Sequence, residues 1–136
     1  MAVSNGLNPS FDAINLVTQE ITADDSESSL NTIRAGKTAV TVDGVTNDAN
    51  DFIVLPSLAD VSVGHTITIY AGAGSNFELR TPASSNEKIN DVDSDGTQEY
   101  LVTDTHTVRV WKISSTAWVA QSITKLGAVA TAVIPD

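Results

Sequence analysis

The chain contains no cysteine, and it is poor in aromatic and basic residues. Without cysteine it cannot form disulfides, thiolate zinc sites, iron–sulfur clusters or a cysteine nucleophile. No run of about 18 apolar residues occurs, so the sequence predicts no membrane-spanning helix. The first residues lack the basic and apolar regions of a secretory signal. Several classes of redox, metal and membrane protein are therefore disfavoured at the outset.

Acidic residues dominate the charge of the chain. Seventeen aspartates and glutamates against seven lysines and arginines give the 136 residues a formal net charge of −10. Such a field repels phosphate backbones and anionic lipid surfaces, so we expect neither a nucleic acid nor a membrane as partner. The hydrophobic fraction of 41% is that of a folding chain. A chain of this length buries one core without a disulfide or a metal, which predicts a single domain.

The composition favours strands over helices. Valine, isoleucine and threonine together account for 41 of the 136 residues, and such β-branched side chains pack well on a pleated sheet. Turn-forming residues separate the apolar segments roughly every 8–12 residues, a spacing typical of β-sandwiches and β-barrels. We therefore predict an all-β fold, a small antiparallel β-sandwich or barrel. It would comprise an irregular N-terminal arm at residues 1–12 and a single β domain over residues 13–136.

The strands can be placed from the alternation of apolar and polar residues. Residues 11–22 fit a helix or a strand, and their β-branched density favours the strand. The tail at 125–136 is predicted to be a last edge strand or a docking extension. The other predicted strands are Lys37–Val42, Phe52–Leu55, His65–Tyr70, Phe77–Arg80, Glu99–Thr103, Thr107–Ile113 and Ala117–Ile123.

One acidic segment matches the opening of a calcium loop. Asp91, Asp93 and Asp95 are followed by Gly96, and alternate carboxylates before a glycine are how an EF-hand loop begins. That loop needs a bidentate glutamate at its twelfth position, where this chain has Val102. The segment is thus a weak candidate for calcium, and the alternative is a solvated hairpin turn.

No arrangement of residues indicates catalysis. The two histidines, His65 and His106, have no partner at a spacing typical of metal ligands. Gly74 and Ser75 are followed by an asparagine, so no nucleophile elbow is present. The acids fall mostly in predicted loops, and few aromatics remain to line a sugar-cleaving cleft. We predict that the protein is not an enzyme and needs no cofactor.

The two tryptophans flank a predicted hairpin loop. Trp111 and Trp118 lie on either side of residues 114–116. Tryptophans in this arrangement form a cross-strand or diagonal pair in the core, or they anchor an interface.

An ordered series of short segments runs through the second half of the chain. It consists of an apolar strand closing on Leu-Pro, a glycine before an alternating strand, an Ile-Asn loop and two later strands that carry tryptophan. These segments are Phe52–Pro56, Gly64, Thr66–Tyr70, Lys88–Asn90, Val108–Trp111 and Ala117–Val119. In this order they resemble, over residues 52–123, a β module that recurs in virion structural proteins of tailed bacteriophages.

The resemblance implies a building block of fibres or of capsid decoration (cement) proteins. Because no repeat or coiled-coil shaft is present, decoration is favoured over a long fibre. We then expect a structural protein, made in the cytoplasm of the bacterial host, that binds the major capsid protein on the outer surface of the phage head. There it would stabilise capsomer junctions, as a homotrimer at local threefold points. A fibre or tail-tip component is the alternative, and a calcium-dependent carbohydrate-binding module is the second.

Contact with the shell is predicted at the apolar-rich ends, residues 1–22 or 124–136, and at the sparse bases. The complete set of candidate interface residues, tryptophans included, is Arg34, Lys37, Arg80, Arg109, Trp111 and Trp118.

Overall fold

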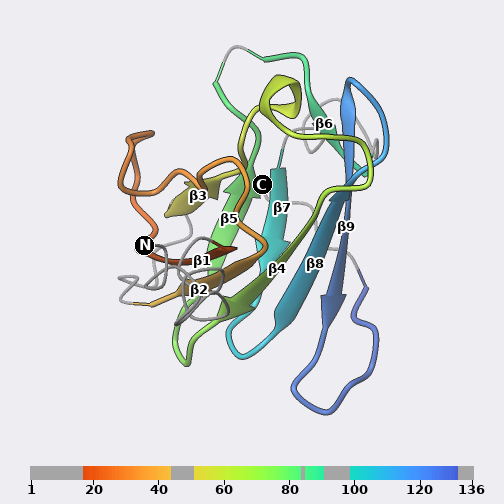
Figure 1. Cartoon of the computed structure of the whole chain (residues 1–136). Helices are drawn as coiled ribbons and strands as arrows, with labels where there is room; N and C mark the ends of the chain where they lie inside the picture. Colours follow the sequence, from red (N-terminus) through yellow and green to blue (C-terminus); the bar gives the residue numbers. More distant parts are fainter. Residues whose placement is uncertain (1–16, 44–50, 84, 91–98, 132–136) are drawn as a thin grey trace, which may run out of the picture.

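The strands form two sheets in the computed structural model, which describes residues 17–43, 51–83, 85–90 and 99–131 (Figure 1). The six-stranded sheet has the order β1 (Thr18–Ile21), β2 (Ala39–Val42), β4 (Thr66–Ala71), β8 (Thr107–Lys112), β9 (Ala117–Ile123) and β6 (Lys88–Ile89). The three-stranded sheet has the order β3 (Phe52–Val54), β5 (Phe77–Arg80) and β7 (Glu99–Val102). The all-β class and the two-sheet sandwich are therefore confirmed. The predicted arm at residues 1–12 lies outside the described residues.

The pairing of the strands is mixed, whereas the predicted sandwich or barrel was antiparallel. Strands β1–β2, β2–β4, β3–β5 and β6–β9 pair in parallel, whereas β4–β8, β5–β7 and β8–β9 are antiparallel. The reason is the path of the chain, which changes sheet between every two consecutive strands from β2 to β8. Neighbours such as β3 and β5 are thus joined by a crossover, as parallel pairing requires.

Alternation along the strands builds one core between the sheets. Ile67 and Ile69 of β4 point inward and are fully buried, as the sequence pattern predicts. Phe77 and Leu79 of β5 meet them from the smaller sheet as part of the same apolar cluster. A hydrogen bond of 2.9 Å, from the Tyr100 hydroxyl to Ser122 Oγ, also joins the two layers. On the other face of β4, the alternate residues Thr68 and Tyr70 point outward and are half-buried and exposed, respectively.

The segment before β2 closes one side of the sandwich. Asn31 is fully buried, and its amide donates to the Phe52 carbonyl at 3.1 Å. The Gln19 side chain on edge strand β1 donates to the Thr32 carbonyl at 3.0 Å and accepts from the Arg34 amide at 2.9 Å. Side-chain amides thus tie this segment to both sheets, which limits access to their edges.

Strand β6 was not predicted, because residues 88–90 read as a hairpin loop in the sequence. It has only two residues, and it pairs in parallel with the start of β9. Asn90 follows with a positive φ of 61°, and its side chain continues the pairing. Its amide donates to the Ala120 carbonyl at 3.1 Å, and its Oδ1 accepts from the Ala120 amide at 2.8 Å. A strand this short carries no alternation that a sequence could reveal.

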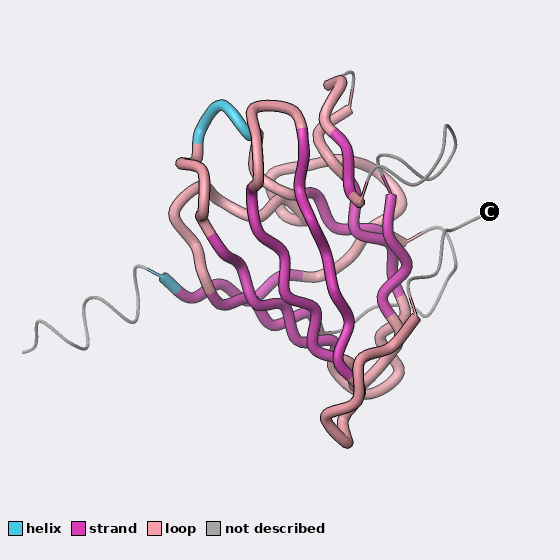
Figure 2. Tube along the Cα trace, turned by 90° about the vertical axis from the view of Figure 1, so that its right-hand side faces the viewer, coloured by secondary structure: helices cyan, strands magenta, loops and turns pink. Residues whose placement is uncertain are grey.

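Buried charges hold a short 3-10 turn, η1 (Leu58–Asp60), which is cyan in Figure 2. At its start, Glu87 Oε1 accepts from the Leu58 amide at 2.8 Å and from the Ser57 hydroxyl at 3.0 Å. At its end, Lys112 Nζ donates to the carbonyls of Leu58 at 2.5 Å and Val61 at 2.8 Å. A carboxylate at the amide end and an ammonium at the carbonyl end complement the dipoles of the turn.

Candidate functional site

The two tryptophans lie on opposite faces of the larger sheet. In the β8–β9 register Trp111 faces Val119 while Lys112 faces Trp118, so successive positions point to opposite sides. Trp118 is fully buried in the core. The structure therefore contradicts an interface role for Trp118, and it also contradicts a direct pairing of the two tryptophans. The number of residues between the two tryptophans does not show which of them faces the core.

Trp111 and Arg109 lie on the outer face of the six-stranded sheet. Trp111 is half-buried and Arg109 is exposed, and both lie on β8. In register, Arg109 has Thr68 on one side and Gln121 on the other. These two candidate interface residues therefore share one open face.

Arg80 lies on the outer face of the smaller sheet and is engaged within the chain. Its Nε donates to Glu78 Oε2 at 2.7 Å and lies 3.4 Å from Glu99 Oε1. The guanidinium also stacks over the Phe52 ring at 4.3 Å from the centroid. Burial raises the pKa of the Glu99 carboxyl, and the charge of Arg80 opposes that rise. The Arg80 guanidinium is thus already engaged by groups of its own chain.

Arg34 and Lys37 lie in the turn that leads into β2. The Lys37 amide donates to the Arg34 carbonyl at 3.2 Å, and the intervening Gly36 has a φ of 86°. The Lys37 carbonyl in turn accepts from His65 Nε2 at 3.0 Å. With Arg80 on one outer face and Arg109 on the other, the four predicted bases do not gather into one patch.

The acidic candidates form no metal centre within the described residues. Asp91, Asp93 and Asp95 lie outside those residues, and within them no group of three or more acidic or histidine side chains could hold a metal ion. The adjacent carboxyls of Asp24 and Asp25 share a hydrogen bond. This bond lowers the pKa of Asp24 and raises that of Asp25. The calcium site stays a sequence prediction.

A hairpin projects from the end of β9 and carries two of the exposed apolar side chains of the described residues (Figure 1, blue). We call residues 124–130 the C-terminal hairpin. The Thr124 amide donates to the Ala128 carbonyl at 2.8 Å, and the Gly127 amide donates to the Thr124 carbonyl at 2.8 Å. The Ala130 amide bonds the Ser122 carbonyl at 2.9 Å, which ties the return segment to the sheet. The hairpin is thus internally bonded, and it belongs to the predicted docking tail.

Two apolar side chains of the C-terminal hairpin face solvent. Leu126 is 89% exposed and Val129 is 66% exposed. Single exposed apolar residues such as Leu30 are ordinary on a protein surface. Here two of them lie on one projecting, hydrogen-bonded hairpin, and Lys125 lies between β9 and Leu126. Exposed apolar residues grouped in this way indicate a site of contact with a partner. The sequence signal for it was the apolar character of residues 125–136.

Together the fold and its surfaces define a two-sheet β-sandwich with an open sheet face and a projecting apolar hairpin. None of the helical residues in the described ranges forms a segment long and apolar enough to cross a membrane. Comparisons with models of protein families, with curated proteins and with solved structures gave no significant match.

Proposed function

We propose that the protein is a structural component of a tailed-phage virion that decorates the outer surface of the head. It binds the major capsid protein, stabilises capsomer junctions and acts as a homotrimer rather than as an enzyme. The ordered segments over residues 52–123 support the phage module. The observation that carries the proposal is the C-terminal hairpin, which offers Leu126 and Val129 to a partner.

The size of the hairpin explains why a trimer is part of the proposal. A stable protein interface buries about 800 Å² on each side, and two aliphatic side chains supply only a fraction of that area. Three copies on one threefold point would engage three hairpins at once, and such multivalency raises the affinity without new kinds of contact. The excess of acidic residues keeps the remaining surface soluble.

Removal of the apolar side chains of the hairpin is expected to weaken binding to the shell. In the double variant Leu126→Ser and Val129→Ser, the apparent affinity for undecorated shells should fall by at least about tenfold, since each buried apolar side chain contributes roughly 1.5–3 kcal/mol. The measurement is co-sedimentation of purified protein with shells assembled without it. Both residues are exposed, so the melting temperature should stay unchanged.

Leu30→Ser is the matched control, because it removes an equally apolar side chain that is 77% exposed on a segment before β2. This variant should co-sediment like the unmodified protein. Equal binding by the hairpin variant and the control would refute the hairpin as the anchor. Binding of the unmodified protein to purified tails, with none to shells, would instead favour the fibre or tail-tip function.

A further inference from the structure

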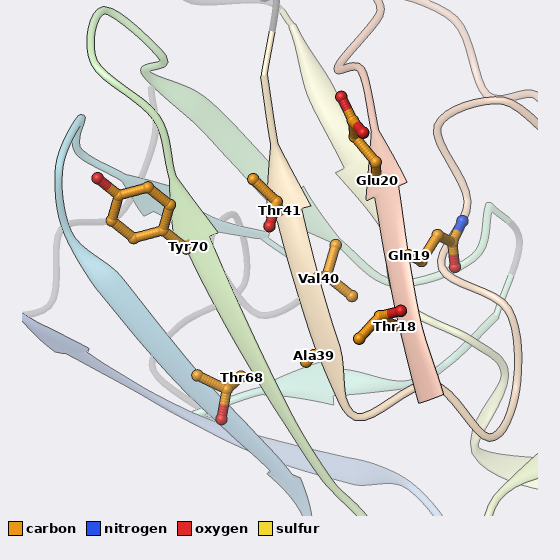
Figure 3. Close-up of a pocket in the computed structure, with 8 residues that line it drawn as sticks. All are labelled: Thr18, Gln19, Glu20, Ala39, Val40, Thr41, Thr68 and Tyr70. Carbon is orange, nitrogen blue, oxygen red and sulfur yellow. The ribbon is translucent and has the colours of Figure 1, made fainter. Parts of the chain in front are cut away.

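A shallow groove crosses the outer face of the six-stranded sheet above β2 (Figure 3). Its floor is formed by the small side chains of β2, and its walls are the neighbouring strands β1 and β4. The outward residues that line it are Thr18, Glu20, Ala39, Thr41, Thr68 and Tyr70. The groove exists because β2 presents alanine and threonine between longer side chains on either side.

Register arranges these residues in two rows across the strands. One row runs from Thr18 through Ala39 to Thr68, and the next runs from Glu20 through Thr41 to Tyr70. The rows are ~7 Å apart along the strands, a length that fits about one or two sugar rings. Figure 3 shows Glu20 and Tyr70 on opposite sides of Thr41.

The polar groups of the groove are available to a ligand. Four polar side chains of the groove form no hydrogen bond within the described part of the chain: Glu20, Thr41, Thr68 and Tyr70. Hydroxyl groups both donate and accept, and the carboxylate accepts. The Tyr70 side chain adds an aromatic ring that is 45% exposed. Such a mixture suits a ligand that carries many hydroxyls and an apolar ring face.

Charge narrows the class of ligand further. The chain has a net charge of −10, and Glu20 places a carboxylate in the groove itself, so polyanions are repelled. A basic peptide could pair with Glu20, but this single carboxylate stands among three hydroxyls, those of Thr41, Thr68 and Tyr70. A neutral ligand rich in hydroxyls uses all four groups, whereas a cation uses chiefly one.

We propose that this groove binds a neutral oligosaccharide. The Tyr70 ring packs against the C–H face of a sugar, the threonine hydroxyls exchange hydrogen bonds with sugar hydroxyls, and Glu20 accepts from a neighbouring pair of them. No residue of this set belongs to the Asp91–Gly96 segment, so binding requires no calcium. Strand β8 lies between the groove and β9 in the sheet, so a ligand in the groove does not use the C-terminal hairpin.

The test is a titration of the ¹⁵N-labelled full chain with cellohexaose, maltohexaose and chitohexaose in the presence of EDTA. At least one sugar should shift the amide signals of residues 39–41 and 68–70, with a Kd of about 1 mM for so shallow a site. Tyr70→Ala should weaken that binding by about tenfold through loss of stacking. Ile113→Ala is the matched control, because Ile113 is 49% exposed beyond the end of β8 and should leave the Kd unchanged.

Two results would overturn the oligosaccharide site. One is the absence of shifts with all three sugars up to about 10 mM, or shifts that Tyr70→Ala leaves unaltered. The other is a groove that ignores the sugars and binds oligolysine in a salt-sensitive manner, which would make it a site for cations. Because Tyr70→Ala should still co-sediment with shells, failure of this site and failure of the decoration function can be told apart.

Discussion

Replacement of Trp118 by alanine is expected to lower the free energy of unfolding by about 3–5 kcal/mol. Trp118 is the largest fully buried side chain of the core, so alanine would leave a large cavity between the two sheets. Folded domains of this size have a total stability of roughly 5–15 kcal/mol. The variant should therefore be partly unfolded at physiological temperature, as urea denaturation followed by fluorescence or circular dichroism would show.

Two further substitutions make this prediction specific. Trp118→Phe should lower the free energy of unfolding by less, about 1–2 kcal/mol, because phenylalanine keeps an aromatic ring at this position. It also removes the indole N–H, which has no hydrogen-bond partner within the described residues. Trp111→Ala is the control for tryptophan loss as such, since Trp111 lies half-buried on the outer face. Equal destabilisation by the two alanine variants would contradict the register that sends them to opposite faces.

Replacement of Lys112 by methionine is the second change with a large expected effect. Methionine keeps the length of the stem but removes the ammonium, which leaves the carbonyls of Leu58 and Val61 without their donor. We expect a loss of about 2–4 kcal/mol, because hydrogen bonds from a charged group are lost and a buried acceptor stays unpaired. Urea denaturation measures the loss, and proteolysis near η1 would report local loosening.

Lys125→Met is the control for this substitution, because Lys125 is exposed on the C-terminal hairpin. It removes the same charge from the chain and should change the stability by less than about 0.5 kcal/mol. Since both variants alter the net charge equally, a difference between them isolates the buried ammonium. If Lys112→Met were as stable as Lys125→Met, the capping role of Lys112 at η1 would be wrong.

Strands with strict alternation could be predicted from the sequence. Ile67 and Ile69, and Val108 and Val110, are inward residues of a period-two pattern, and each of these pairs is fully buried. The pattern exists because a sandwich buries one face of each strand and leaves the other to solvent. For the same reason, the predicted bounds of β4, β8 and β9 are close to the observed ones.

Pairing and polar burial could not be predicted in the same way. Parallel neighbours such as β3 and β5 are set by crossovers between the sheets, and local alternation is the same for both directions of pairing. Lys112 follows Val108 and Val110 on the inward face, where a charged residue is unexpected, and only the carbonyls around η1 make its burial favourable. Long-range partners of this kind leave no trace in a local pattern.

The candidate site was predictable only in outline. An apolar tail at residues 124–136 indicated a docking segment, but its hairpin depends on hydrogen bonds between Thr124 and Ala128. The groove depends on register, because Glu20, Thr41 and Tyr70 come from three strands that are far apart in sequence. The basic residues were predicted to contact the shell, and the fold distributes them over different faces.

The most direct test of the decoration function is electron cryomicroscopy of undecorated shells mixed with the purified protein. We predict added density on the outer surface of the head, in trimers at local threefold points, with the C-terminal hairpin against the major capsid protein. The Leu126→Ser and Val129→Ser variant should show little of this density at the same concentration. Bare shells at saturating unmodified protein, or density confined to the tail, would contradict it.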